Sequence, residues 1–435
     1  MLIYKFNKNL AALSMLVQYR KLYFIDSEKL PSKDGATVFA VNHPTAFTDS
    51  FIFMVYSPFD CYFMLRGDFF RVSPFVRWFM DQIRLIPIFR QRDGISALKQ
   101  NQELFEMFYQ ILHDKKDISI MVEGSHDHRK RLRKVQRGTA RIVFGTYDKY
   151  GDEDIKIVPV GVTYSNVTQF RSTAAVRFGD PILLKDYLTL HHEKPRKAML
   201  KMTKDIEDAM KPLLVHIERE EDDEIVNLLL DMSRNDRVES LFPPFSKNAQ
   251  ALEEEIALAN QVNAMQSNEK ADFAAKIQAY FKHLNTLNVK DLGLAQCKQI
   301  GFETLVFLLL GSPLFVLGYI LAFVPLLIAK RVLSKVEKPE FIASMMLVSG
   351  MFGYLIYFIV MLIVAFVIGT WWSILGVFLM PFISYFAILY RDVFLKWRAV
   401  QQFKALDIEK KESLLKKRTS ILGLFQTRAM NLSTP

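Results

Sequence analysis

The sequence predicts an α/β fold, in which a mixed, largely parallel sheet flanked by helices is followed by a helical region and C-terminal transmembrane helices. Between residues 31 and 215, short apolar runs alternate with helical patterns, which is typical of strands joined by crossover helices. From about residue 302 to 390 the chain is almost free of charge. A run of that length favours a lipid environment, because one spanning helix needs about 20 apolar residues.

Five short apolar runs, each followed by polar or turn-forming residues, are expected to be strands. They are residues 36–41, 84–89, 118–124, 155–164 and 175–182, the last near a sheet edge because of Pro181. Helical patterns occupy residues 50–57, 95–113, 137–149 and 197–216. We therefore expect residues 31–215 to form one α/β domain.

The regions on either side of this domain are expected to be helical. Residues 1–30 predict an amphipathic N-terminal helix and not a signal peptide, because Lys and Asn interrupt the apolar positions. This helix can lie on a membrane or pack on the domain, and the sequence leaves both open. Acidic residues flank apolar ones at helical spacing in residues 216–300, which favours a helical hairpin or small bundle.

Residues 301–392 are predicted to be the membrane region. Residues 341–390 fit two spans, at about 343–368 and 371–390, joined by a tight turn. Lys and Arg collect at residue 298, at 330–338 and from 391 onward, and the positive-inside rule places all three clusters on the cytoplasmic side. We therefore expect residues 302–329 to dip in and return near Gly311–Pro313; a plain span is the alternative. Residues 393–435 are expected to be a basic cytoplasmic tail.

Charge and cysteine content narrow the class of protein. The net charge of +10 suits an anionic membrane surface or phosphorylated substrates. The chain carries no zinc-type or RNP-type motif, so we expect no nucleic-acid partner. Cys61 and Cys297 are the two cysteines, which excludes a disulfide scaffold and fits a reducing compartment.

The clearest chemical signal follows the first predicted strand. His43 and Asp49 lie six positions apart, which is about 240° on an ideal helix, so the pair can meet only if the segment is looped, as Pro44 favours. A histidine held by a carboxylate has a fixed tautomer and can act as a general base toward an alcohol. The competing interpretation is a chance spacing of two common residues.

Further polar residues follow other predicted strands. Glu123, Gly124 and Ser125 end the run 118–124 and suit the binding of a polyol; Arg90 follows the run 84–89, and Arg66 is a weaker candidate. A basic segment then suits either phosphate binding or a membrane surface, and both interpretations stay open. Its seven cations are Arg129, Lys130, Arg131, Arg133, Lys134, Arg137 and Arg141.

These residues fall in four ordered blocks across roughly residues 30–185, and in them the chain resembles the PlsC-like glycerolipid acyltransferase superfamily. The blocks are Asn42-His43 with Asp49, the apolar run ending at Arg90, residues 121–125, and residues 157–160. The segment FMLRGDFFRVSPFVRWFM resembles the stretch between the first two blocks. The resemblance implies an acyltransferase-type α/β fold in this part of the chain.

Two positions depart from the family pattern. Five residues separate His43 from Asp49, where the family usually has four. Some glycerol-phosphate and dihydroxyacetone-phosphate acyltransferases share the longer spacing and a Phe like Phe47, which favours glycerol 3-phosphate as acceptor. Val122 replaces the usual Pro of the third block, which affects the stiffness of the loop.

The resemblance implies direct acyl transfer from acyl-CoA or acyl carrier protein to a hydroxyl of glycerol 3-phosphate or lysophosphatidate. It implies that His43 is the base and Asp49 its support, and that Arg90, Glu123, Gly124 and Ser125 hold the acceptor. Backbone amides after His43 are expected to bind the oxyanion. We expect no cofactor and no metal, because His126, Asp127 and His128 are poorly spaced as ligands.

With this resemblance, the sequence predicts an integral membrane protein that works in phospholipid synthesis, with its catalytic domain on the cytoplasmic face of a bacterial inner membrane. The oligomeric state is left open. Two alternatives stay open as well. One is an O-acyltransferase for another lipid acceptor, such as an aminolipid, and the other is a lipid-binding scaffold without activity.

Overall fold

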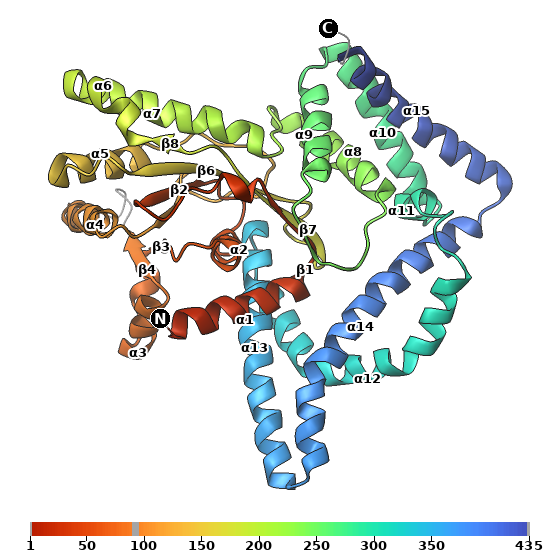
Figure 1. Cartoon of the computed structure of the whole chain (residues 1–435). Coiled ribbons are helices and arrows are strands. Elements are labelled where there is room, and N and C mark those ends of the chain that lie inside the picture. The colour runs from red at the N-terminus through yellow and green to blue at the C-terminus, as the bar shows by residue number, and fades with distance from the viewer. Residues whose placement is uncertain (1, 89–94, 433–435) are drawn as a thin grey trace. The chain divides into compact units, whose positions relative to one another are not determined.

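The computed structural model describes residues 2–88 and 95–432 (Figure 1). The chain divides into two compact units. The first comprises Met1–Val215, Pro244–Gln250 and Val332–Met351, and the second comprises His216–Pro243, Ala251–Arg331 and Phe352–Pro435. The first segment of the first unit ends at residue 215, and its other two segments come from later in the chain.

The first unit contains a mixed, mostly parallel sheet, as the sequence predicts. Among the described residues it has nine strands in the order β4-β3-β5-β2-β6-β7-β1-β9, with β8 paired to β6. All neighbours run parallel except β6 with β7 and β6 with β8. The strands are β1 (Tyr19–Ile25), β2 (Thr37–Val41), β3 (Tyr62–Arg66), β4 (Leu85–Ile88), β5 (Ile118–Met121), β6 (Lys156–Tyr164), β7 (Ser172–Phe178), β8 (Ile182–Leu183) and β9 (Phe245–Ser246).

Helices cover both faces of this sheet. Val38 and Ala40 of β2 face a core shared with α4, α5 and α7, while Phe39 packs against Phe53 of α2 and against Phe59. Successive strand residues point to opposite faces, so a central strand covered on both sides is buried at every position, as β2 is. The helices of the unit are α1 (Leu2–Gln18), α2 (Thr48–Tyr56), α3 (Pro74–Gln82), α4 (Ile95–His113), α5 (Gly138–Tyr150), α6 (Leu188–Glu193) and α7 (Pro195–Met210).

Three features of the sheet differ from the sequence-based expectation. The N-terminal helix ends at Gln18, and β1 follows it inside the expected leader, where Arg20 and Lys21 resemble a polar helix face. Phe245 and Ser246 pair with β1, so the region 216–300 is not wholly helical; Pro243 and Pro244 stop a helix there. Because β1 and β9 extend the sheet, β7 is an interior strand and not an edge strand, and Pro181 lies beyond its end.

Helix α1 packs on the domain along one face. Tyr4, Ala11 and Met15 are buried at helical spacing, whereas Phe6 and Leu13 are exposed on the other side. Of the two placements left open for this helix, the structure shows packing on the domain. The outward face still carries apolar side chains.

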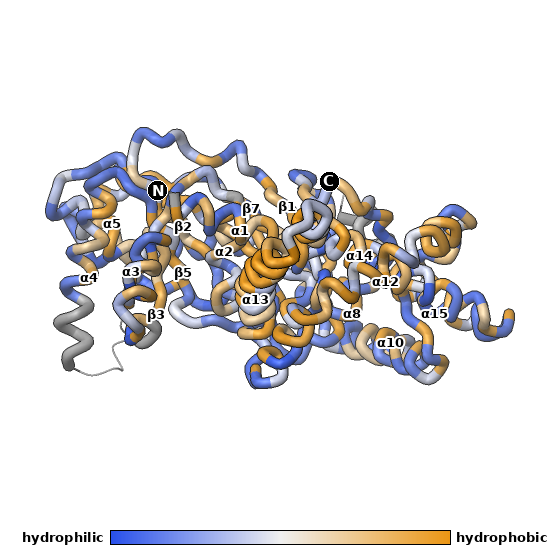
Figure 2. The backbone as a smooth tube through the Cα atoms, turned by 90° about the horizontal axis from the view of Figure 1, so that it is seen from below, coloured by the Kyte–Doolittle hydropathy of each residue, from blue (hydrophilic) through white to orange (hydrophobic). Residues whose placement is uncertain are grey.

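Three described helices are long and apolar enough to cross a membrane, which suggests membrane association. They are α12 (Phe302–Leu333), α13 (Pro339–Ile368) and α14 (Trp371–Lys404), and the orange colour of α13 in Figure 2 shows its hydrophobic character. Gly369, at a φ of 74°, and Thr370 join α13 to α14. The turn predicted at Gly311–Pro313 is wrong, because α12 stays helical through Pro313 and Pro325, and apolar helices tolerate such prolines.

The second unit contains polar helices in addition to the parts of α12, α13 and α14 that belong to it. Its polar helices are α8 (Asp223–Asp236), α9 (Gln250–Asn263), α10 (Ser267–Thr286), α11 (Asp291–Ala295) and α15 (Ile408–Leu432). The segment expected to be a basic tail thus continues α14 and then forms α15, whose Leu414, Ile421 and Phe425 are buried. Arg418 of α15 donates to the buried Asp291, and this bond anchors the helix within the unit.

The buried carboxyl group of Asp117, immediately before β5, is expected to make the free energy of unfolding depend on pH. Burial raises the pKa of Asp117 to about 6, against the hydrogen bond that its carboxylate accepts from Thr37 N–H. Between about pH 4 and 6 the folded protein therefore holds a proton that the unfolded chain has released, so stability falls as pH rises through this window. Asp117→Asn, whose amide oxygen can still accept from Thr37, should raise the free energy of unfolding at neutral pH by about 1–3 kcal/mol.

Thermal unfolding of the detergent-solubilised protein as a function of pH measures this effect. The exposed Asp114, whose pKa Lys116 lowers, gives the matched control Asp114→Asn. The gain of Asp117→Asn should be near zero at about pH 4 and complete at neutral pH. An equal gain at both pH values, or the same gain in the control, would contradict the assignment.

Candidate active site

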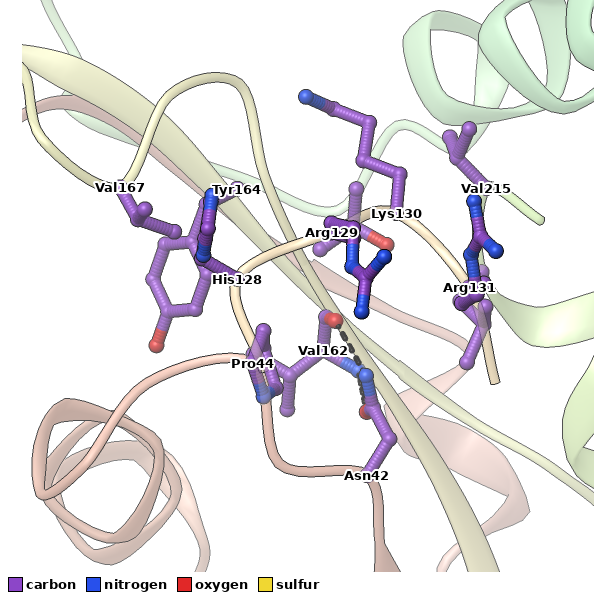
Figure 3. Close-up of a pocket in the computed structure, with 12 residues that line it drawn as sticks. Asn42, Pro44, His128, Arg129, Lys130, Arg131, Val162, Tyr164, Val167 and Val215 are labelled. Atoms are coloured by element: carbon purple, nitrogen blue, oxygen red, sulfur yellow. Dashed lines mark hydrogen bonds between the residues drawn. The ribbon is translucent and has the colours of Figure 1, made fainter. Parts of the chain in front are cut away.

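The strand β2 delivers the predicted site to the carboxyl edge of the sheet. Its neighbours β5 and β6 both run parallel to it, so their ends lie beside its own. Asn42 continues the ladder with its side chain: Nδ2 donates to Val162 O at 2.9 Å, and Val162 N donates to Oδ1 at 2.6 Å (Figure 3). The amide fixes the chain where it leaves the sheet, immediately before His43.

His43 and Asp49 meet at this edge. His43 Nδ1 lies 2.9 Å from Asp49 Oδ2, because the chain loops through Pro44 and returns into the first turn of α2. The carboxylate is fully buried, and 14 % of the His43 side chain is exposed. With Nδ1 bonded to the carboxylate, Nε2 is the ring nitrogen left for a substrate.

Asp49 accepts three further hydrogen bonds. Thr45 donates its N–H at 2.9 Å and its hydroxyl at 2.8 Å, and the Tyr164 hydroxyl at the end of β6 donates at 2.8 Å. Burial and the charge of Asp49 raise the pKa of Tyr164 well above its usual value, so this hydroxyl stays a donor. Neither Thr45 nor Tyr164 was predicted to belong to the site, although Tyr164 ends a predicted strand, β6, which the structure pairs with β2.

Glu123 connects the loop after β5 to His43. Its Oε2 accepts from His43 N–H at 3.0 Å and from Arg133 Nη2 at 2.7 Å, and its Oε1 accepts from Arg133 N–H at 2.8 Å. Gly124 has a φ of 70°, which favours glycine, and Arg133 Nη1 also donates to Ser125 Oγ at 2.6 Å. These contacts organise the loop, and the predicted binding of an acceptor by Glu123, Gly124 and Ser125 stays a prediction.

The basic segment divides between several partners. Arg129 forms a fork with Asp127, with a shortest contact of 2.8 Å; burial opposes the ionisation of Asp127, but Arg129 outweighs it and lowers the pKa. Arg141 lies over the Phe105 ring at 4.1 Å. A shallow recess lies beside the edge of the sheet (Figure 3), lined by Asn42, Pro44, His128, Arg129, Lys130, Arg131, Val162, Thr163, Tyr164, Val167, Leu214 and Val215.

Among the described residues, one predicted substrate residue lies away from these contacts. Arg66 is exposed at the carboxyl end of β3, two strands from β2 in the sheet. Arg90 lies outside the described residues.

Four amides of the stretch after His43 have acceptors within the protein, and the expected binding of an oxyanion near this helix start stays a prediction. Thr45 N–H donates to Asp49, Ala46 N–H to the carbonyl of Glu340, and both Phe47 and Thr48 N–H to Ser344 Oγ. These amides are thus engaged within the protein, because the helix start is built into a packed environment. The ring of His126 lies edge-on to His43 with centroids 5.6 Å apart.

Residues 21–163, which carry this edge of the sheet and both members of the pair, match the family model described as Acyltransferase. The chain carries a domain of the acyltransferase family. The chain is similar to Glycerol-3-phosphate O-acyltransferase 1 of Saccharomyces cerevisiae, at 38 % identity over 78 residues, which is 18 % of this chain and 10 % of that protein. Glycerol-3-phosphate O-acyltransferase 2 of the same organism is 28 % identical over 111 residues, covering 25 % and 15 % of the two chains.

These alignments cover a small part of the length of both yeast relatives. Among solved structures, the 1-acyl-sn-glycerophosphate (LPA) acyltransferase PlsC from Thermotoga maritima is similar at 12 % identity and a TM-score of 0.34, covering 46 % of this chain and 78 % of the other.

The Glu123–Arg133 ion pair is expected to stabilise the edge of the acyltransferase domain. The Glu123 side chain is 2 % exposed, and Arg133→Ala leaves this buried carboxylate without its cation. The free energy of unfolding should fall by about 2–4 kcal/mol. Arg137→Ala, in the same segment but exposed, is the matched control and should change it by less than about 0.5 kcal/mol.

Chemical denaturation of both variants in detergent, compared with the parent protein, measures the difference. Equal stability of the Arg133→Ala and Arg137→Ala proteins would show that the pair does not hold this loop.

Proposed function

We propose that this protein is a membrane-bound O-acyltransferase that moves a fatty acyl group from an acyl thioester to a hydroxyl of glycerol 3-phosphate or lysophosphatidate. The observation that carries the proposal is the His43–Asp49 contact of 2.9 Å at the carboxyl edge of the sheet, beside a cationic recess. Sites in open α/β sheets form at this edge.

In the proposed reaction, His43 Nε2 takes the proton of the acceptor hydroxyl as its oxygen attacks the thioester carbonyl carbon. The carbon–oxygen bond forms, the tetrahedral intermediate collapses, and the carbon–sulfur bond breaks. The leaving thiolate recovers the proton from the imidazolium. The buried carboxylate of Asp49 stabilises that imidazolium and holds the ring in the tautomer with the proton on Nδ1.

The acceptor's phosphate is proposed to bind in the recess lined by Arg129, Lys130 and Arg131. Arginine and lysine are the side chains that proteins use most for phosphate, through charge-assisted hydrogen bonds. The yeast relatives are glycerol-3-phosphate O-acyltransferases by name, which favours that acceptor over lysophosphatidate. The donor is proposed to be acyl-CoA or acyl carrier protein, both of which are anionic.

The catalytic domain is proposed to face the cytoplasm. The basic residues Lys330, Arg331, Lys335 and Lys338 follow or end α12, and Arg391, Lys396 and Arg398 lie in the last part of α14. Such clusters beside apolar helices favour the cytoplasmic side. A cysteine introduced at Lys335 should react with an impermeant reagent from the cytoplasmic side and not from the outer side of sealed vesicles.

The base proposal predicts the effect of two substitutions on turnover. His43→Ala should lower kcat by about 10²–10⁴-fold, the usual contribution of a general base, and Asp49→Asn should lower it by at least about tenfold. Labelled acyl transfer by purified protein, from a thioester to glycerol 3-phosphate, measures both.

His113→Ala is the matched control, because His113 is also bonded to an aspartate, Asp152, but its side chain is 43 % exposed and it ends α4. Its turnover should equal that of the parent protein. Normal turnover by a folded His43→Ala protein would end the proposal.

The phosphate proposal predicts a change in acceptor binding. Lys130→Ala should raise KM for glycerol 3-phosphate by about tenfold with little change in kcat, because the lost contact is made in ground and transition states alike. The exposed Lys134, in the same segment, gives the control Lys134→Ala with the same change of charge.

Initial rates over a range of acceptor concentrations measure both variants. An identical KM in the Lys130→Ala and Lys134→Ala proteins would move the phosphate out of this recess.

A further inference from the structure

The helix that carries Asp49 is capped by a residue from far along the chain. The first amides of a helix need acceptors from outside it, and serine is among the side chains that serve best. The position before α2 is Phe47, whose side chain has no oxygen. Ser344 Oγ fills that role: it accepts from Phe47 N–H at 2.8 Å and from Thr48 N–H at 3.1 Å, and lies 3.0 Å from Thr48 Oγ1.

Ser344 lies in the second turn of α13, which is one of the three helices long enough to span a membrane. The beginning of that helix belongs to the first unit, and Figure 1 shows it next to α2. Both Ser344 and Thr48 are fully buried. A buried amide without an acceptor destabilises a fold, so the amides of Phe47 and Thr48 depend on the Ser344 hydroxyl.

Neighbouring residues of α13 bind the same loop. Glu340 O accepts from Ala46 N–H at 3.1 Å, so three consecutive amides, 46–48, donate to one stretch of α13. The Phe341 ring packs edge-on against Phe47, with centroids 6.4 Å apart, and against His126, at 4.9 Å. His126 in turn lies edge-on to His43.

The position of Asp49 depends on this packing. Asp49 follows Thr48 directly and lies in the first turn of α2, whose start the Ser344 hydroxyl holds. The other members of the carboxylate's shell come from Thr45 and Tyr164, so a shifted first turn moves Asp49 against fixed partners. Because general-base catalysis depends on geometry at the scale of a fraction of an ångström, a small shift is enough to slow turnover.

We infer that Ser344 is a positioning residue for acyl transfer: its hydroxyl caps the helix that carries Asp49, and docking of the first turns of α13 completes the His43–Asp49 pair. The inference rests on the proposed function. An apolar helix is thereby part of the active-site scaffold, and not only an anchor.

The experiment compares Ser344→Ala with Ser349→Ala in the purified full-length protein. Ser349 is the matched control, because it lies in the same helix and its hydroxyl contacts Met346 O of its own turn at 3.4 Å. Ser344→Ala should lower kcat at least tenfold and leave both KM values within about twofold, and Ser349→Ala should behave as the parent protein. Ser344→Thr, which keeps the hydroxyl, should recover most of the lost kcat.

A double-mutant comparison separates positioning from a general structural role. If Ser344 acts through Asp49, adding Ser344→Ala to Asp49→Asn should cost less than about twofold further kcat, whereas independent effects would multiply. Ser344→Cys is the second variant should Ser344→Ala fail to fold, since the thiol has similar size but is a weak acceptor. It should also lose kcat.

Three results would overturn the inference while the proposed function stands. The first is a turnover of Ser344→Ala or Ser344→Cys equal to that of Ser349→Ala. The second is a rise of KM in Ser344→Ala as large as the fall of its kcat. The third is a double mutant in which the losses of kcat from Ser344→Ala and Asp49→Asn multiply. If instead His43→Ala retains turnover, the proposed function fails, whatever Ser344 does.

Discussion

The buried carboxylate of Asp49 is the constraint on which the candidate site depends. It is fully buried and is bonded by His43 Nδ1, by the Thr45 N–H and hydroxyl, and by the Tyr164 hydroxyl. A charge in such a place is tolerated only when hydrogen bonds replace the water it has lost. The loop after β2, the end of β6 and the start of α2 therefore have to stay in register with one another, and His43 is fixed as a consequence.

The sheet order explains why these donors come together. β2 lies between β5 and β6, and all three run in the same direction. Asn42 binds the backbone of Val162 on one side, and Glu123, after β5, binds His43 N–H on the other. The histidine thus leaves the sheet between two neighbours that hold its main chain, while Asp49 holds its ring. Hydrogen bonds to the backbone therefore position the site, and the cationic residues Arg129, Lys130 and Arg131 line the recess at this edge of the sheet.

The sequence was sufficient for the parts of the fold and site that depend on local pattern. Apolar runs with polar ends identified β2, β5 and β6, and the spacing of His43 and Asp49 required a loop. The strand β1 was missed because Arg20 and Lys21 interrupt its apolar run, and its pairing with β7 joins segments about 150 residues apart. No local pattern indicates that Ser344 caps α2, because 296 positions separate it from Thr48. For Arg133 the sequence left open phosphate binding and a membrane surface, because its pairing with Glu123, ten positions away, depends on how the loop folds.

The most direct test of the proposed base is the tautomer of the His43 ring, observed by nitrogen-15 NMR of histidine-labelled protein in detergent at about pH 8. The chain has 8 histidines, so the signals of His43 are assigned by their loss in His43→Gln. The proposed role of His43 predicts the tautomer with the proton on Nδ1, facing Asp49, and a bare Nε2 that can accept the proton of an acceptor hydroxyl. A proton on Nε2 and a bare Nδ1 would mean that the carboxylate does not hold the ring, and would contradict the base assigned to this site.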